Sequence, residues 1–566
     1  MSKTFTINNI KWDRIWISFF IEEITAGLTD GKGEAAVYIK DISGQYSFKL
    51  QPGEAENEFK LNITNPGNCK MLPTGIWELV VFEGASLKSK DLHSDNLSLT
   101  ESCINNIKKY NRQFIYFHSE RAYRVQFSDR NGFKIKTSDV VLEGISKKQK
   151  LVSSLRRMKN DTAKSILRTI YNTEFLLFHR KPLKKYSGSS LEDNLHKIKN
   201  PRILLMSDQS EEMGSNMAAL KKAMIREGYQ PEEALRAITT KHYNILHWVK
   251  TLKKIAWADF IFLDDHSQTT DWLTIKGAVI TQLWHAGAGF KSTGYSRFGM
   301  PASPAPKSGH RQYTYGIAGS KKIRHFFSEV WGINDEMVLP TGMPRLDEYL
   351  DEDYIKKTKE KLFKDYPALC KPSTDGTIKE KRDNIILFAP TYRGENKRHA
   401  YYPYDKLDID RLYKLCEETD SFIIFKMHPF VEEPVPIPEE YKDRMLDLVK
   451  YPNINDLFYI SDLLITDYSS NIYEFSLMRK PMLFYAFDTD EYTKERGFHR
   501  DYRTNVPGKI VETFDDMINA IKAKDFEYEK VEEYIENNFE FTDTHACDRI
   551  INWIIRGKRS DISKSS

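Results

Sequence analysis

The first 145 residues alternate apolar and polar positions in short runs that are rich in aromatic and β-branched residues. The clearest runs are residues 16–21, 36–40, 59–63, 77–82 and 122–127. Runs of this kind, separated by Gly, Pro and Asn turns, are typical of antiparallel strands. We therefore predict a small all-β sandwich or barrel over residues 1–145. It carries no catalytic signature, which favours a recognition or spacer module.

Beyond residue 200 the pattern changes to unbroken apolar runs that alternate with helical patterns such as residues 217–226. The apolar runs are residues 202–206, 258–263, 278–284, 384–389, 422–426, 462–466 and 481–485. Buried runs of this length are typical of parallel sheets covered by helices on both faces. A division near residues 340–344 predicts two doubly wound, Rossmann-like α/β domains, 200–340 and 341–555, with a frayed tail at 556–566. Ligands of such domains bind at the carboxyl ends of the strands.

Residues 146–199 form a basic linker between these two parts. Between residues 147 and 185 there are twelve Lys and Arg but only two acids. An amphipathic helix is indicated by apolar residues at near-helical spacing, namely Leu151, Leu155, Met158, Ile166, Ile170 and Leu177. Anionic lipid attracts each nearby cation by roughly 1 kcal/mol, so we expect membrane contact through Arg156, Arg157 and Lys159. The alternative is a solvated linker helix packed on the next domain.

Composition narrows the class of protein. The 566 residues carry 84 Lys and Arg against 80 Asp and Glu, and 40% of them are hydrophobic, which excludes wholesale disorder. Five scattered Cys without CxxC spacing indicate neither a disulfide framework nor a zinc site, and a reducing compartment fits best. No apolar run of about 18 residues and no signal-like start is present, so we expect a peripheral protein on the cytoplasmic side. No nucleic-acid motif accompanies the basic stretch, so nucleic acid is not an expected partner.

Candidate catalytic side chains follow the predicted strands. His285 comes directly after the run 278–284 and precedes glycines that allow a ligand to approach the backbone. Neutral imidazole takes up a proton near pH 7, so His285 is a candidate general base. His428 stands in the same position after the run 422–426.

A phosphate site is indicated after the run 462–466. Asp467 is followed by Ser469 and Ser470 and then by a predicted helix at 471–479, whose first amides and two hydroxyls suit an anion. Arg393, after the run 384–389, would clamp the phosphate in bidentate fashion, and Glu474 would accept hydrogen bonds from ribose hydroxyls. Each feature alone is as readily explained by packing or an N-cap, so the combination carries the hypothesis.

The same segments, in the same order, resemble one family. They are His-Ala-Gly-Ala-Gly-Phe-Lys at 285–291, Pro-Thr-Gly-Met-Pro-Arg-Leu-Asp at 340–347, Phe-Ala-Pro-Thr-Tyr-Arg at 388–393, Lys-Met-His-Pro at 426–429 and Ile-Ser-Asp-Leu-Leu-Ile-Thr-Asp-Tyr-Ser-Ser at 460–470. Over about residues 200–530 the chain is similar to the CDP-glycerol glycerophosphotransferases, the bacterial teichoic acid polymerases and primases. The resemblance implies a GT-B fold, with residues 200–340 as acceptor domain and 341–555 as CDP-alditol donor domain.

The resemblance also implies the reaction and its partners. An alditol phosphate would pass from CDP-ribitol or CDP-glycerol to a lipid-linked teichoic acid or capsule polymer, at the cytoplasmic face of the membrane, with release of CMP. The β-rich amino-terminal region and Trp284-His285-Ala286 are more similar to the ribitol branch. A homo-oligomer is compatible with this family. The alternatives are a GT-B transferase or epimerase acting on a UDP-sugar, and an inactive polymer- or lipid-binding module.

Site residues carried by the resemblance fall into three groups. His285 and His428 are expected to be catalytic, with His285 as the base. The acceptor side is expected to include Gly287 and Lys291. The donor is expected to contact Arg345, Arg393, Thr466, Asp467, Ser469, Ser470 and Glu474. No carboxylate cluster resembling a Mg²⁺ site accompanies the serine pair, so we expect no metal and no other cofactor.

Overall fold

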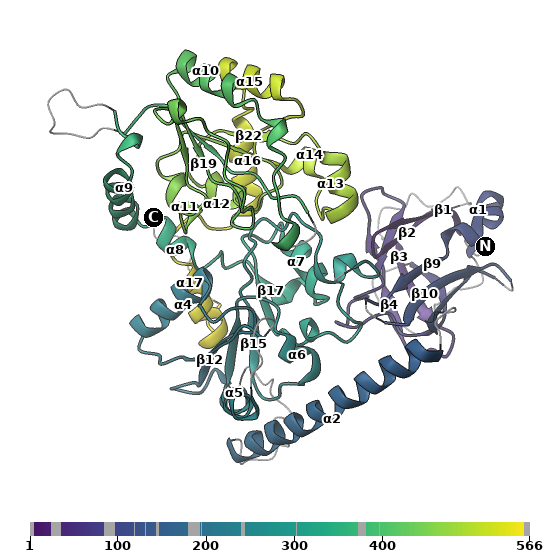
Figure 1. Ribbon diagram of the computed structural model, residues 1–566. Helices are drawn as coiled ribbons and strands as arrows, with labels where there is room; N and C mark the ends of the chain where they lie inside the picture. Colours follow the sequence, from purple (N-terminus) through teal and green to yellow (C-terminus); the bar gives the residue numbers. More distant parts are fainter. Residues whose placement is uncertain are drawn as a thin grey trace.

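A computed structural model of the chain describes residues 5–23, 35–83, 97–117, 119–130, 132–142, 147–178, 193, 195–238, 244–301, 303–371, 381–394 and 397–559. Figure 1 shows three bodies: an amino-terminal β region in purple, a lower α/β region in blue and teal, and an upper α/β region in green and yellow. We call them the β region, the first α/β region and the second α/β region.

The β region consists of two sheets that share one apolar core. One sheet has the order β5-β6-β2-β1-β8 and the other β4-β3-β7-β11-β10-β9. The strands are β1 (Phe5–Asp13), β2 (Trp16–Glu23), β3 (Ala35–Asp41), β4 (Ser47–Lys49), β5 (Gln51–Pro52), β6 (Glu58–Asn62), β7 (Gly75–Glu83), β8 (Leu97–Leu99), β9 (Arg112–Ile115), β10 (Arg121–Ser128) and β11 (Lys134–Val141), with helix α1 (Glu101–Asn106) after β8. Ile17 of β2 and Val37 of β3 belong to the same buried cluster. All five strands predicted from alternation are present.

Helix α2 (Lys147–Phe178) runs from the β region to the first α/β region, which confirms the predicted linker helix (Figure 1). Its packing face overlaps the predicted stripe only in part: Ile170 packs, as predicted, on the buried cluster that includes Tyr171 and Phe175. Tyr171 and Phe175 are buried against α5 (Ile245–Trp257), whereas Ile166 and Leu177 are more than half exposed. The side chains of Arg156, Arg157 and Lys159 lie outside the described residues. Among the helices that the structure describes, none combines the length and apolarity needed to span a membrane.

The first α/β region is built on a parallel sheet of order β13-β12-β14-β15-β16-β17. Its elements are β12 (Ile203–Ser207), α4 (Ser215–Arg226), β13 (Glu232–Leu235), α5, β14 (Phe260–Leu263), α6 (Gln268–Trp272), β15 (Val279–Gln282), β16 (Tyr315–Ile317), α7 (Arg324–Trp331) and β17 (Val338–Leu339). Strands β12, β14 and β15 are fully buried, as their apolar runs predict. The edge strand β13, Glu-Glu-Ala-Leu, has no such run, so its sequence did not predict it.

The second α/β region has a parallel sheet of order β20-β19-β18-β21-β22-β23. Its strands are β18 (Ile385–Phe388), β19 (Phe422–Phe425), β20 (Met445–Asp447), β21 (Leu463–Thr466), β22 (Met482–Tyr485) and β23 (Lys509–Val511). Its helices are α8 (Leu346–Tyr349), α9 (Glu352–Asp365), α10 (Ile409–Thr419), α11 (Ile454–Phe458), α12 (Ile472–Ser476), α13 (Thr489–Arg496), α14 (Tyr502–Asn505), α15 (Phe514–Ala523) and α16 (Glu529–Asn538). The chain is therefore a mixed α/β protein in which the β region is followed along the sequence by two parallel-sheet regions.

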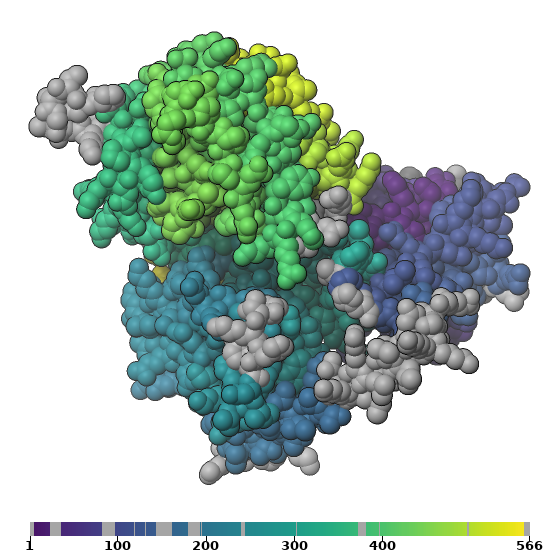
Figure 2. All heavy atoms as spheres, viewed as in Figure 1, coloured from purple at the N-terminus to yellow at the C-terminus, as the bar shows by residue number. Residues whose placement is uncertain are grey.

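The carboxyl-terminal helix α17 (Ala546–Ile550) returns to the first α/β region. Cys547 and Ile550 belong to the same buried cluster as Met217 of α4. Arg226 of α4 also forms an ion pair with Asp548. Figure 2 shows the two α/β regions as stacked lobes with the β region beside them. This return of the chain fixes the two lobes to each other.

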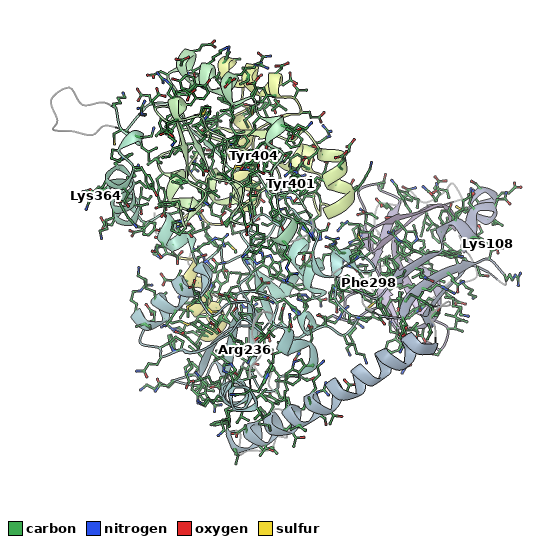
Figure 3. All side chains as sticks on the ribbon, viewed as in Figure 1. Lys108, Arg236, Phe298, Lys364, Tyr401 and Tyr404 are labelled. Atoms are coloured by element: carbon green, nitrogen blue, oxygen red, sulfur yellow. The ribbon has the colours of Figure 1, made fainter. Side chains whose placement is uncertain are left out.

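The β region packs against the first α/β region and is not separated from it by a flexible spacer. Phe298, labelled in Figure 3 near this junction, stacks on Phe114 with ring centroids 5.7 Å apart. Glu329 of α7 accepts a hydrogen bond of 2.8 Å from the Trp16 indole and forms an ion pair with Arg14. Because Phe298 and Glu329 are both buried, these contacts hold the β region firmly in place.

Candidate functional site

The loop that carries His285 begins with a strained residue. Trp284, two residues after the end of β15, has φ of 55°, a left-handed conformation that is uncommon for a bulky side chain. Asn216 donates a hydrogen bond of 2.7 Å to the Trp284 carbonyl, and Gln282 accepts one of 2.9 Å from its amide. The His285 ring stacks on the Trp284 ring at 4.7 Å and remains 61% exposed. The turn therefore presents an accessible imidazole on a fixed backbone.

This loop then reaches the second α/β region. A Cβ atom on Gly287 would lie 2.5 Å from the ring of Tyr473 in α12, so no other residue fits there without movement. Lys291 forms an antiparallel bridge with Phe498, and the His499 amide donates a hydrogen bond of 2.8 Å to the Phe290 carbonyl. The His285 loop is thus packed directly on α12, the helix that follows Ser469 and Ser470.

The protein around His285 favours its neutral form. The surrounding protein limits hydration and lowers the pKa of His285 below its ordinary value of 6.5. Asp265 opposes this shift and Arg345 adds to it. A neutral imidazole at pH 7 has a free nitrogen lone pair, which is what a general base needs.

His428, in the second α/β region, is held in one tautomer. The Phe430 amide donates a hydrogen bond of 3.2 Å to Nδ1, which leaves the proton of the neutral ring on Nε2. Burial, together with the charges of Lys291 and Lys426, lowers the pKa of His428 to about 4. The charge of Lys291, in the His285 loop, therefore acts on the His428 ring. His428 can therefore donate a proton in a hydrogen bond but is a poor base.

The serine pair lies at the start of a helix that is shorter than predicted. Ser469 and Ser470 are both partly exposed, and the Ser469 hydroxyl accepts a hydrogen bond of 3.2 Å from the Asn471 amide. Helix α12 covers Ile472–Ser476, five residues, where the sequence predicted residues 471–479. The prediction of a long helix was wrong, because the chain turns after Ser476. The two hydroxyls remain accessible, but such a short helix contributes little dipole.

Thr466 and Asp467 are buried and bind the protein itself. The Thr466 hydroxyl donates a hydrogen bond of 2.7 Å to the Ala389 carbonyl. The Asp467 carboxylate accepts one of 2.7 Å from the Thr391 amide. These contacts join the carboxyl ends of β18 and β21, so both residues shape the site and neither side chain is exposed to a ligand.

Arg393 is engaged by carboxylates. Its guanidinium forms two hydrogen bonds with Asp488, of 2.6 and 2.9 Å, and an ion pair of 3.0 Å with Asp467. These carboxylates raise the pKa of Arg393 in spite of its burial, which by itself lowers it. The predicted bidentate clamp on a phosphate would require Arg393 to exchange these partners. In this structure Arg393 ties the ends of β21 and β22 together.

Arg345 and Glu474 also bind each other. Arg345 forms an ion pair with Glu474 and donates a further hydrogen bond of 2.8 Å to the His285 carbonyl. Both side chains are nearly buried. The predicted ribose contact of Glu474 would again require an exchange of partners. The pair instead connects the His285 loop to α12.

Sequence reasoning missed two residues beside His285. Asp265 follows β14, and its carboxylate lies 3.5 Å from the His285 ring. Gln282, at the end of β15, is fully buried and contacts the backbone on both sides of this pair. The signal that located the other candidates, polar residues after an apolar run, also marks Asp265.

A cavity of about 1280 Å³ adjoins the site where the three regions meet. Phe117 of the β region, Arg297 and Met300 of the first α/β region, and Tyr492 of the second line its walls. Tyr401, labelled in Figure 3, is another lining residue. The Lys291 ammonium lies over the Tyr492 ring, 5.7 Å from its centre, so the cavity borders the His285 loop.

Within the described ranges, no three His, Cys, Asp or Glu side chains are grouped closely enough to hold a metal ion. The side chains around Ser469 and Ser470 therefore do not form such a group among the described residues. The expectation of a reaction without a metal or other cofactor stays a prediction.

Comparison with known proteins gives consistent results. The profile of the CDP-glycerol:poly(glycerophosphate) glycerophosphotransferase family matches residues 189–556. The chain is 32% identical over 413 residues to the teichoic acid ribitol-phosphate polymerase TarL of Staphylococcus aureus, covering 72% of this chain and 68% of that one. It is 36% identical to the teichoic acid poly(ribitol-phosphate) polymerase of Bacillus spizizenii, covering 63% of this chain and 56% of that one. A solved variant of the wall teichoic acid polymerase TagF superposes with a TM-score of 0.52 at 20% identity, covering 73% of this chain and 98% of that one.

Proposed function

Because the chain belongs to the CDP-glycerol:poly(glycerophosphate) glycerophosphotransferase family, we propose that it transfers an alditol phosphate from a CDP-alditol to a polyol-phosphate polymer and releases CMP. It is a CDP-alditol phosphotransferase of teichoic acid biosynthesis. The observation that carries this proposal is the packing of the His285 loop against α12, the helix that follows Ser469 and Ser470, with the charge of Lys291 acting on His428. A base and phosphate-binding groups from two sheets thereby border one space.

His285 acts as the base. The terminal hydroxyl of the acceptor gives its proton to the imidazole, and the oxygen attacks the phosphorus that bears the alditol. The bond between this phosphorus and the CMP oxygen breaks, and CMP leaves. A positioned base contributes about 10²- to 10⁴-fold to such a reaction.

Neutral and cationic donors stabilise the charge on the pyrophosphate. The Nε2 proton of His428, the hydroxyls of Ser469 and Ser470, and the Lys291 ammonium are the donors best placed for this role. Arg393 and Arg345 keep these groups in position through Asp467, Asp488 and Glu474. Gly287 allows the close approach of the acceptor loop to Tyr473.

The finer assignments extend this proposal. The two parallel-sheet regions form a GT-B pair, in which residues 200–340 bind the acceptor and residues 341–555 bind the donor, behind a β-sandwich of residues 1–145. Ribitol is the favoured alditol, since two relatives at 32% and 36% identity are named ribitol-phosphate polymerases. The acceptor is lipid-linked, and the enzyme works on the cytoplasmic face of the membrane. The basic helix α2, with Arg156, Arg157 and Lys159, supports this peripheral location.

A donor-specificity assay tests the function. The full chain is incubated with a lipid-linked polyol-phosphate acceptor and, in turn, CDP-ribitol, CDP-glycerol and a UDP-sugar, and the released nucleotide is measured. We expect acceptor-dependent release of CMP and its loss in the His285→Ala variant. Release of UDP would establish a sugar transferase instead, and conversion of the UDP-sugar into its epimer would establish an epimerase. Polymer binding without nucleotide release would establish an inactive binding module.

A further inference from the structure

The carboxylate of Asp265 faces Nδ1 of the His285 ring. Its Oδ2 atom lies 3.5 Å from Nδ1 of His285. Asp265 follows β14 and the His285 loop follows β15, and these strands are parallel neighbours in the sheet. The carboxyl ends of adjacent parallel strands therefore bring the two side chains together.

The carboxylate and the loop are held by the same residues. The His266 amide donates a hydrogen bond of 2.7 Å to the Asp265 carboxylate. The Gln282 amide group donates one of 3.1 Å to the Asp265 carbonyl and accepts one of 2.9 Å from the Trp284 amide. Gln282 is fully buried, so it has little freedom to move. The Gln282 side chain thus holds the backbone next to both Asp265 and His285.

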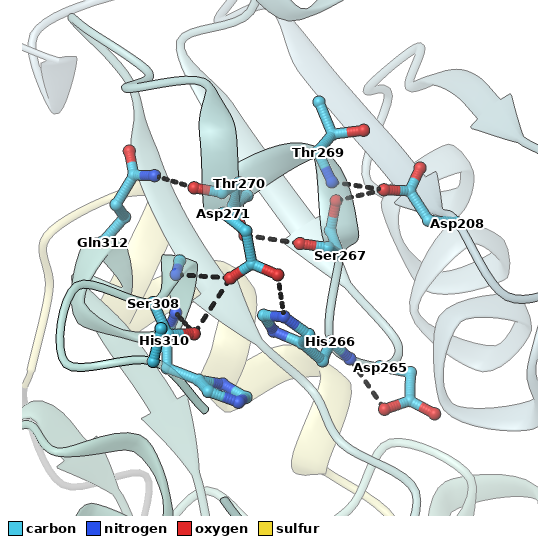
Figure 4. A network of polar contacts seen from close by, with 12 residues as sticks. Asp208, Asp265, His266, Ser267, Thr269, Thr270, Asp271, Ser308, His310 and Gln312 are labelled. Atoms are coloured by element: carbon cyan, nitrogen blue, oxygen red, sulfur yellow. Dashed lines mark hydrogen bonds and ion pairs between the residues drawn. The ribbon is translucent and has the colours of Figure 1, made fainter. Parts of the chain in front are cut away.

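A second polar network anchors the backbone at Asp265 through the neighbouring residue His266 (Figure 4). The His266 ring contacts the Asp271 carboxylate at 3.0 Å, and Asp271 accepts hydrogen bonds from the Ser308 hydroxyl and the Gly309 amide, at 2.9 and 2.8 Å. Asp265 therefore stands on a rigid support, as expected of a residue that orients another.

Resting on the transfer reaction proposed above, we propose that Asp265 is a positioning residue that holds His285 with its Nδ1 proton toward the carboxylate. Nε2 is then the nitrogen that faces the acceptor hydroxyl and takes its proton. The carboxylate stabilises the imidazolium formed in this step, and that proton passes to solvent after CMP has left. Carboxylate–imidazole pairs serve this purpose in other enzymes, where the carboxylate keeps its charge throughout.

The charges near His285 determine in which direction its pKa changes when Asp265 is replaced. Arg345 contacts the His285 carbonyl and disfavours a charged ring, but Glu474 partly neutralises Arg345. Asp265 is the group that favours the charged ring. Removal of its carboxylate must therefore lower the pKa of His285.

The first experiment compares Asp265→Ala and Asp265→Asn with the control Asp264→Asn. Asp264 is the adjacent carboxylate, but it lies against Gly214 of the α4 N-terminus. We expect Asp265→Ala to lower kcat about 10²-fold, the lower end of what a positioned base supplies, and to move the acidic limb of the pH profile to lower pH. We expect Asp264→Asn to keep the wild-type profile. An unmoved acidic limb in Asp265→Ala would overturn the proposal.

The second experiment removes the base. In a His285→Ala background, Asp265→Ala should cause almost no further loss of activity, because a positioning residue has nothing left to position. If the double variant instead lost activity by the product of the two single-variant fold-losses, the proposal would be overturned.

A third measurement does not depend on turnover. NMR titration of histidine ring signals, with His285→Ala to assign the resonance, should show a lower pKa of His285 in Asp265→Ala than in the wild type. An unchanged pKa would overturn the pairing of Asp265 with His285. If the wild type transferred no alditol phosphate, the proposed function would fail while this titration still decided the pairing.

Discussion

Arg345 and Glu474 form an ion pair at the junction of the two parallel-sheet regions, with Nε of Arg345 2.9 Å from Oε1 of Glu474. Arg345 follows the last strand of the first sheet, and Glu474 lies in the helix after β21 of the second. The same guanidinium holds the His285 carbonyl. The stability of this junction and the placement of the proposed base, His285, therefore depend on one ion pair.

We expect Glu474→Ala to lower the free energy of unfolding by about 3–5 kcal/mol, since it leaves Arg345 buried without its partner. Transfer activity should fall as well, because Arg345 no longer fixes the His285 loop. Urea unfolding followed by fluorescence measures the first effect. The control is Arg479→Ala, which removes an exposed pair with Glu532 and should change stability by no more than about 0.5 kcal/mol. Equal effects of the two variants would contradict the structural role of Arg345.

His285 and His428, for which we propose catalytic roles, should respond differently to pH and to substitution. His285 must be neutral to act as a base, and its pKa is below 6.5, so kcat/KM should rise with pH along a limb that lies below pH 6.5. His428, with a pKa of about 4, stays neutral over the same range and acts as a hydrogen-bond donor. Gln retains a donor group but is no base. His428→Gln should therefore keep more activity than His428→Ala, whereas His285→Gln should be as inactive as His285→Ala. Rescue by Gln at both positions, measured as CMP release, would argue against this division of roles.

Gly287→Ala tests the close approach of the His285 loop to α12. The new Cβ would lie 2.5 Å from the Tyr473 ring, which is fully buried and has no room to move. We expect the variant to lose about 1–3 kcal/mol of stability, as overpacked sites do, together with most of its activity. The control is Gly75→Ala in β7, where the nearest atom would be 3.8 Å away. Unfolding and CMP-release assays of both variants should separate the two positions, and wild-type behaviour of Gly287→Ala would show that the loop is not tightly packed.

Buried histidines should make the protein sensitive to acid. Burial lowers the pKa of His310 and of His499 well below 6.5. Below pH 6.5 the unfolded chain therefore binds protons that the folded chain does not. The stabilisation from these neutral rings is present above pH 6.5 and is lost as the pH falls below it. Unfolding free energies measured between pH 7 and pH 5 should decrease, and the decrease should be smaller in His310→Gln. An equal slope in this variant would contradict the assignment.

The sequence alone determined the central strands of both parallel sheets and named the candidate site residues that follow them. Fully buried parallel strands such as β12 and β19 must be apolar on both faces, so their runs were visible, whereas the polar edge strand β13 was not. His285 and His428 each follow a buried strand, one in each sheet. Because doubly wound domains bind ligands at the carboxyl ends of their strands, this position predicted that both residues face a ligand between the two domains.

Tertiary structure decided which of these residues remain accessible. Arg393 and Glu474 were predicted to bind the donor, yet they pair with Asp488 and Arg345, partners that are 95 and 129 residues away in the chain. Asp265 faces His285 only because β14 and β15 are neighbours. Local sequence fixes residue type and strand ends, but ion pairs between distant segments depend on how the sheets are packed together, and no single run of residues encodes that.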